Sequence, residues 1–284
     1  MQNQLYWSLI KRFSSSNKYG FTFQDAVNEF PERHPTYLSQ VLSHMVRKGM
    51  LYKISRHTYH IIPLNADPES YKPDSHQVTK YLMGNEAYYI GYTAALELHE
   101  PGQLDSEAGP YCKDANPGAV QYVVTKKQMK PAFRSIEGRN FRFISLEPSR
   151  FFGFESIEIN PLEQAMVSDL EKTIVDIASR PQLCGGIVTL GNALNKNRNR
   201  ISQYKLLQYL GRNQVKSAMK RVLFLTELLA LKWTDGHELM LEELGTGISL
   251  LDPGAPQYGR QWNKFGVKIN VDPLVIKAKV LDFK

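Results

Sequence analysis

Cysteine is scarce in this sequence: only Cys112 and Cys184 occur among 284 residues. Neither has a second cysteine or a histidine at the spacing of a zinc site, so we expect no metal and no other cofactor. The low count favours a reducing compartment, although it leaves room for a single buried disulfide. A role for Cys184 as a nucleophile would need an electropositive, exposed setting.

Long hydrophobic runs are also missing. No apolar segment is long enough to span a bilayer, and residues 1–13 lack the apolar core and cleavage site of a signal peptide. We therefore expect a cytoplasmic protein with no membrane partner. A hydrophobic content of 42% and a charged content of 22% are typical of a globular chain, and its length suits two domains.

Catalytic and nucleotide-binding motifs are absent as well. The sequence contains no G-x-x-x-x-G-K-[ST], no G-x-G-x-x-G and no H-E-x-x-H. Asp169 and Glu171 lie close together, as in a metal-dependent nuclease, which we keep as an alternative. However, Ser168 and Glu171 have the spacing of a helix capping box, and Asp169 suits a helix N-terminus. We expect a helix start here and no enzyme.

The positive charge is unevenly distributed. The net charge is +7. Residues 1–62 contain eight basic and three acidic side chains, a net charge of +5, which leaves +2 for the other 222 residues. A small basic unit is the electrostatic pattern expected of a DNA-binding module.

Helical periodicity divides this basic unit into three helices. Apolar residues recur at helical spacing over 5–13, over 23–30 and over 36–48. Thr22 is suited to be the N-cap of the second helix, and Gly49 to end the third in a left-handed conformation.

A hairpin with a basic tip follows the third helix. Strands are expected at 51–54 and 59–61, separated by 55–57. Three helices and a hairpin form the order of a winged helix-turn-helix, whose third helix enters the major groove. The outer side of this helix contains no acid. The residues predicted to contact DNA are Thr36, Tyr37, Ser39, Gln40, Ser43, His44 and Arg47 on the helix, with Lys53, Arg56 and His57 on the hairpin. A winged helix that binds protein instead is the alternative.

A larger domain should follow a proline-containing connection at 63–73, with the boundary near residue 70 and domains at 1–70 and 71–284. Helices and strands alternate irregularly, which predicts an α+β fold with a mixed, largely antiparallel sheet. The expected helices lie at 78–83, 93–99, 168–179, 201–210 and 214–231. The expected strands lie at 87–92, 120–125, 140–147, 154–159, 248–251, 267–271 and 275–281.

A second basic cluster lies in the larger domain. Between Asn195 and Arg221 no acidic residue occurs. The cluster is either simply solvated or a second surface for DNA backbone or an acidic partner. Its members are Lys196, Arg198, Arg200, Lys205, Arg212, Lys216, Lys220 and Arg221.

Three motifs in the larger domain can be compared with known families. The first is YIGYTAALELH at 89–99. The second is EKTIVD at 171–176, with Arg180-Pro181 and Gly185-Gly186 after it. The third is LLDP at 250–253 with Trp262 and GVKIN at 266–270. Taken together, these motifs resemble those of the AbiE-type abortive-infection antitoxins, and the resemblance covers nearly the whole chain.

This resemblance implies a transcriptional autorepressor that binds inverted repeats in its own promoter. It also implies an antitoxin of a type IV toxin–antitoxin system, which antagonises a nucleotidyltransferase-like toxin without a stable complex between the two. Two features depart from the family pattern. Arg56-His57-Thr58 stand where the wing usually has a glycine before its aromatic residue, and the loop around 110–112 is longer.

Overall fold

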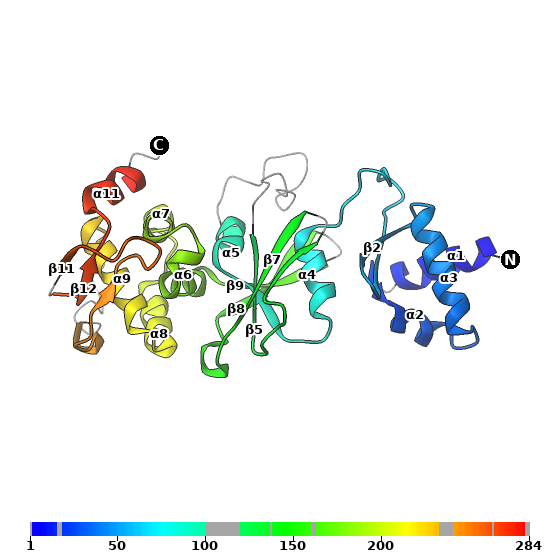
Figure 1. The fold of residues 1–284 in the computed structure, drawn as a ribbon, viewed down its shortest axis with the longest axis horizontal. Coiled ribbons are helices and arrows are strands. Elements are labelled where there is room, and N and C mark those ends of the chain that lie inside the picture. Colours follow the sequence, from blue (N-terminus) through cyan, green and yellow to red (C-terminus); the bar gives the residue numbers. More distant parts are fainter. Residues whose placement is uncertain are drawn as a thin grey trace.

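A computed structural model describes residues 2–15, 19–99, 120–136, 138–160, 163–232, 241–262 and 264–281. Cys112 and the long loop at 101–118 lie outside the described residues. Three regions follow one another along the longest axis (Figure 1): an N-terminal region, a central sheet and a C-terminal, mostly helical region. Among the described helices, none has the length and apolar character needed to cross a membrane.

The N-terminal region is a winged helix-turn-helix. Strands β1, β3 and β2 form, in that order, an antiparallel sheet beside the helices. The three predicted helices and the hairpin are confirmed, whereas β1 was not predicted because three residues are too few to show a period. The elements are α1 (Gln2–Ser15), β1 (Gly20–Thr22), α2 (Phe23–Glu29), α3 (Pro35–Arg47), β2 (Leu51–Ser55) and β3 (Thr58–Ile61).

Local capping fixes where these helices begin and end. Thr22 and Asp25 form a capping box: the Thr22 hydroxyl accepts a bond from the Asp25 amide, and the Asp25 carboxylate accepts one from the Thr22 amide. Helix α3 begins with Pro35 at its first position, after His34, whose Nδ1 accepts a bond from an amide of the first turn. Gly49, with φ of 66°, follows its end as predicted.

The central sheet has six strands in the order β6-β7-β5-β4-β9-β8. The pairs β7–β5 and β4–β9 are parallel and the other three are antiparallel, which confirms a mixed, largely antiparallel sheet. Strands β6 and β9 were not predicted. The strands are β4 (Tyr88–Ile90), β5 (Val120–Thr125), β6 (Phe133–Ile136), β7 (Arg139–Ser145), β8 (Phe154–Asn160) and β9 (Glu163–Ser168).

Both faces of the sheet are covered, so its strands alternate between two cores. On one face Ile90 and Phe141 pack with Val78 of α4 (Ser75–Met83). On the other face Tyr89 and Val124 pack with α5 (Tyr92–His99) and the C-terminal helices. Successive residues of one strand therefore pack into different cores, because their side chains point to opposite faces of the sheet.

The C-terminal region packs helices around α6 and adds a small three-stranded sheet. The elements of the C-terminal region are η1 (Pro148–Arg150), α6 (Leu170–Ser179), η2 (Pro181–Leu183), α7 (Ile187–Lys196), α8 (Gln203–Asn213), α9 (Lys216–Leu228), β10 (Ser249–Leu250), β11 (Arg260–Trp262), β12 (Val267–Ile269) and α11 (Pro273–Leu281). Helix α7 and strand β11 were not predicted.

The strand predicted at 275–281 is wrong, because this segment belongs to α11. Its β-branched residues favour a strand on propensity. However, the Asp272 carboxylate accepts a bond from the Leu274 amide at 2.8 Å and caps the first turn. Ile276 and Val280, one turn apart, are then buried in the large core against α7. Capping and tertiary packing decide against propensity here.

The winged helix-turn-helix also packs on the central region. Ile54 of β2 is buried in the same apolar cluster as Val78 of α4. A Cβ at Gly20 would overlap the ring of Tyr81, so this tyrosine lies directly on β1. Residues 63–73 thus connect two regions that are packed against each other. Helix α3 lies on the side of the small sheet that faces away from α4 (Figure 1).

Candidate nucleic-acid interface

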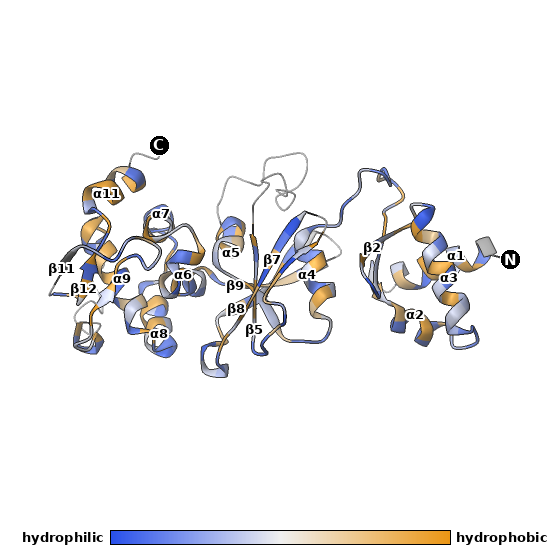
Figure 2. Cartoon of the chain, viewed as in Figure 1, coloured by the Kyte–Doolittle hydropathy of each residue, from blue (hydrophilic) through white to orange (hydrophobic). Residues whose placement is uncertain are grey.

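The outward side of α3 is exposed and consists of polar and basic side chains. Thr36, Ser39, Gln40, Ser43 and Arg47 are all exposed, while the opposite side of the helix is buried. The helix shows both hydrophobic and hydrophilic residues in Figure 2. The structure thus brings these five predicted residues together on one accessible surface.

Tyr37 and His44 lie at the borders of this surface and are half-buried. Tyr37 packs against the N-terminal core. His44 stacks on the ring of Tyr6 of α1, with 5.9 Å between the centroids, and the Lys48 ammonium lies 5.8 Å from the same ring. These contacts attach α3 to α1 and fix the side chains at its edges.

The tip of the hairpin exposes Lys53, Arg56 and His57. The wing is short, and its tip is attached to α2: the Phe23 amide donates a bond to the His57 carbonyl at 2.8 Å. A register shift between Lys53 and Ser55 bends β2 just before the turn. The backbone of the turn is therefore held, the centroid of the His57 ring lies 6.5 Å from that of the Phe23 ring, and the side chains of Lys53 and Arg56 are exposed to solvent.

The acids of the N-terminal region do not neutralise this surface. Asp25 is used in the capping box. Glu29 forms an ion pair with Arg12 of α1 at 2.6 Å, and Glu32 lies 3.5 Å from Arg33. None of these acids is on α3 or the wing. A surface of this charge and chemistry suits the phosphates and base edges of DNA.

His34 is a positioning residue that was not singled out in the sequence. Its ring nitrogen accepts the Thr36 amide at 3.3 Å and so satisfies one of the amides that open α3. The signal that could have identified it is Pro35, since proline favours the first helical position.

The second basic cluster is not a single surface, and that prediction is wrong for two of its members. Lys220 and Arg221 are 1% and 4% exposed. The Arg221 guanidinium donates to the carbonyls of Ala178, Leu250 and Leu251. Burial lowers the pKa of Arg221 to about 10, still well above neutral pH. Both side chains join α9 to the segments at 245–251.

The other members of this cluster make separate local contacts. Lys205 bridges Asp169 and Glu171 at 3.2 and 3.1 Å. Arg200 donates to the carbonyl of His99, and Arg212 stacks over an aromatic ring at 4.0 Å. The exposed members are Lys196, Arg198, Arg200, Arg212 and Lys216.

The acids considered for a nuclease have structural partners. Asp169 is the N-cap of α6, and its carboxylate accepts a hydrogen bond from the Lys172 amide at 2.8 Å. The predicted capping box of Ser168 and Glu171 is therefore wrong, although a helix does begin here. Glu171 accepts the amide of Ser202 at 2.8 Å. Among the described residues, no group of three or more His, Cys, Asp or Glu side chains could hold a metal ion.

Two further groups with reactive side chains are buried. Lys172 forms an ion pair with Asp176, which also accepts the Tyr89 hydroxyl at 2.9 Å. The Lys172 side chain is 0% exposed. Burial raises the pKa of Cys184 to about 12, which keeps this thiol protonated at neutral pH. Both groups lie inside the C-terminal core, away from substrates in solution.

The fold defines a class: a winged helix-turn-helix joined to an α+β region. It is shared by a protein of Mycobacterium tuberculosis, RV2827C, whose crystal structure matches with a TM-score of 0.63. The match covers 98% of this chain and 95% of that chain at 15% sequence identity, so it shows the fold alone. No family model and no curated protein matches the sequence.

Proposed function

We propose that this protein is a transcriptional autorepressor that binds inverted repeats in double-stranded DNA through α3, and that it is the antitoxin of a type IV toxin–antitoxin system. One observation carries the DNA-binding part. The outward side of α3 is exposed, lacks acidic residues and ends at Arg47, beside a wing tip with Lys53 and Arg56.

The dimensions of α3 suit the major groove. Thirteen residues span about 20 Å at ~1.5 Å per residue. Gln40 has the amide that pairs bidentately with adenine, and Arg47 the guanidinium that pairs with guanine or a phosphate. Ser39 and Ser43 are short enough to let the helix approach base edges closely. The wing residues would contact the adjoining phosphates.

The docking of the winged helix on the central region leaves this approach open. The small sheet meets α4, whereas α3 lies on its other side (Figure 1). DNA could therefore lie along α3 without touching the larger region. The larger region then remains available for a second role.

The antitoxin part rests on the motif resemblance. Two motif segments are adjacent in space, because Tyr89 of the first donates a hydrogen bond to Asp176 of the second. These motif residues hold the central sheet against the C-terminal helices. The proposed antagonist is a nucleotidyltransferase-like toxin encoded next to this chain, with no stable complex required.

The DNA-binding proposal is tested with the full chain and its own upstream region in a fluorescence anisotropy titration. We expect specific binding that weakens steeply as salt rises, since several phosphate contacts release counterions. The paired substitution Gln40→Ala and Arg47→Ala should abolish the preference over scrambled DNA. Binding that is absent, or insensitive to salt, would favour a protein-binding winged helix.

The antitoxin proposal has a separate test. The neighbouring reading frame is expressed alone and together with this chain, and growth is followed. We expect arrest by the neighbour alone and recovery on co-expression. Recovery should persist with Gln40→Ala and Arg47→Ala when both genes are under foreign promoters, because antagonism would not use α3. Absence of arrest, or of recovery, contradicts the antitoxin role.

A further inference from the structure

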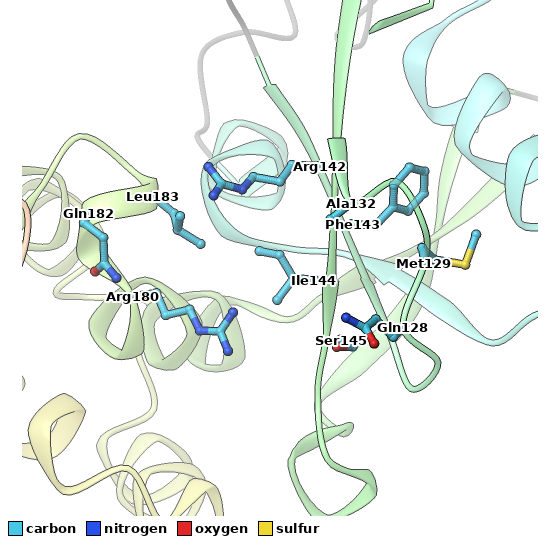
Figure 3. A pocket seen from close by; sticks show the side chains of 10 residues that line it. All are labelled: Gln128, Met129, Ala132, Arg142, Phe143, Ile144, Ser145, Arg180, Gln182 and Leu183. Atoms are coloured by element: carbon cyan, nitrogen blue, oxygen red, sulfur yellow. The ribbon is translucent and has the colours of Figure 1, made fainter. Parts of the chain in front are cut away.

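A cavity of about 420 Å³ lies between strand β7 and the turn that follows α6. It is distinct from the α3 surface and from the acids near the start of α6. Two arginines from different elements line it: Arg142 of β7 and Arg180, the C-cap of α6. Figure 3 shows both guanidinium groups on the same side of β7, with Ile144 between them.

In the part of the chain that the structure describes, neither arginine is held in an ion pair by an acidic side chain. Among the described residues, neither guanidinium has an ion pair or a hydrogen bond to another side chain or carbonyl. The buried carboxylate of Asp176 attracts Arg180 electrostatically, but its direct contacts are with Lys172 and Tyr89. Two like charges held at one concave surface favour an anion that both can contact.

The rest of the lining is suited to an organic group. Ile144 and Leu183 provide apolar surface between the arginines, and the amides of Gln128 and Gln182 can both donate and accept hydrogen bonds. A volume of about 420 Å³ falls within the ~300–1,000 Å³ range of small-molecule sites. An inorganic ion alone would leave most of this space and the apolar surface unused.

We propose that this cavity binds a phosphate monoester of mononucleotide size. The phosphate lies between Arg142 and Arg180, since a guanidinium fork matches phosphate oxygens bidentately. The organic part covers Ile144 and Leu183, and its polar edge meets an amide of Gln128 or Gln182. The ligand therefore joins the central sheet to the C-terminal helices.

A simpler interpretation is that both arginines are solvated charges. Solvation explains one exposed arginine well, because surface charges need no partner. It does not explain why two of them, from β7 and from the end of α6, converge on one cavity with apolar and amide lining. A nucleic-acid surface is also less suitable, since the site is a partly open pocket with two arginines and not an extended basic track.

The probes are the four nucleoside 5′-monophosphates, with the matching nucleosides and inorganic phosphate as comparison ligands, titrated into the full chain by calorimetry. We expect at least one monophosphate to bind, its nucleoside to bind at least tenfold more weakly, and inorganic phosphate to bind more weakly as well. Arg142→Gln and Arg180→Gln should each reduce the affinity at least tenfold. Arg33→Gln, a remote exposed arginine, is the matched control and should leave it unchanged.

Three outcomes would overturn the proposal: no monophosphate binds, inorganic phosphate binds as tightly as the esters, or binding survives both cavity substitutions. Arg180 follows α6 directly, so its loss could disturb the fold. Arg142 is on an edge of the cavity formed by β7, and Arg142→Gln tests the site independently, with circular dichroism to verify folding. None of these measurements depends on DNA binding.

Discussion

The N-terminal and C-terminal regions are both rich in basic residues, but among the described residues only the C-terminal region buries some of them. In the N-terminal region Arg47, Lys53 and Arg56 are exposed on α3 and the wing. In the C-terminal region Lys220 and Arg221 are buried and donate to backbone carbonyls. A basic run in a sequence thus indicates an interface only if the fold leaves it unpaired.

The difference follows from what each helix meets. Helix α3 has the small sheet on one side and solvent on the other. Helix α9 is packed between α6 and the small C-terminal sheet, and the segment at 245–251 presents carbonyls to it. A buried cation persists only when such acceptors replace water. The predictions below test this contrast, from the largest expected effect to the smallest.

Arg221→Ala should destabilise the protein most. The buried carbonyls of Ala178 and Leu251 and the partly buried carbonyl of Leu250 would lose their donor, and at about 1–3 kcal/mol for each buried group we expect a loss of at least about 2 kcal/mol. Thermal unfolding measures the effect. Lys216→Ala, which removes an exposed charge from the same helix, should change stability by less than about 0.5 kcal/mol. Equal effects of the two substitutions would remove the contrast between the regions.

Arg47→Ala should weaken binding to the promoter by about 1–3 kcal/mol if Arg47 contacts a base, with stability unchanged within about 0.5 kcal/mol. Anisotropy titrations and thermal unfolding measure the two quantities. Arg12→Ala is the matched control, because Arg12 of α1 lies away from α3 in sequence and is paired with Glu29 of α2. Unchanged promoter affinity in Arg47→Ala would exclude Arg47 from the interface.

Thr22→Ala should cost about 1 kcal/mol of stability, since it removes one half of the capping box at α2. The position of the winged helix on α4 should be retained. Unfolding in urea measures the loss, and Thr36→Ala, at an exposed position of α3, is the comparison. A similar loss in both variants would mean that the cap at Thr22 has no special role.

Lys53→Ala should have the smallest effect, a weakening of DNA binding that is uniform across sequences. The slope of log affinity against log salt should fall by about 1, because one phosphate contact is lost. Titrations at several salt concentrations on promoter and scrambled DNA measure it. A loss confined to the promoter would instead indicate that Lys53 reads a base.

Sequence patterns predicted the winged helix almost completely, because its signals are local. Each helix has its own period, and Thr22 and Gly49 mark boundaries through their own chemistry. The exposed side of α3 follows from the same period. Prediction was weaker in the larger region. Strand β6 is short and edge-exposed, and β9 follows directly on β8, so neither shows a distinct pattern.

The sequence by itself determined the helices of the N-terminal region, their ends and the polar side of α3, since these depend on neighbours within a few residues. The tertiary structure alone decided that 275–281 is helical, that Arg221 is buried, and that Arg142 and Arg180 share a cavity. Each of these outcomes depends on contacts with a segment that is distant in the sequence. No local sequence pattern shows which distant segment buries α11, which carbonyls accept from Arg221, or which second arginine lies beside Arg142.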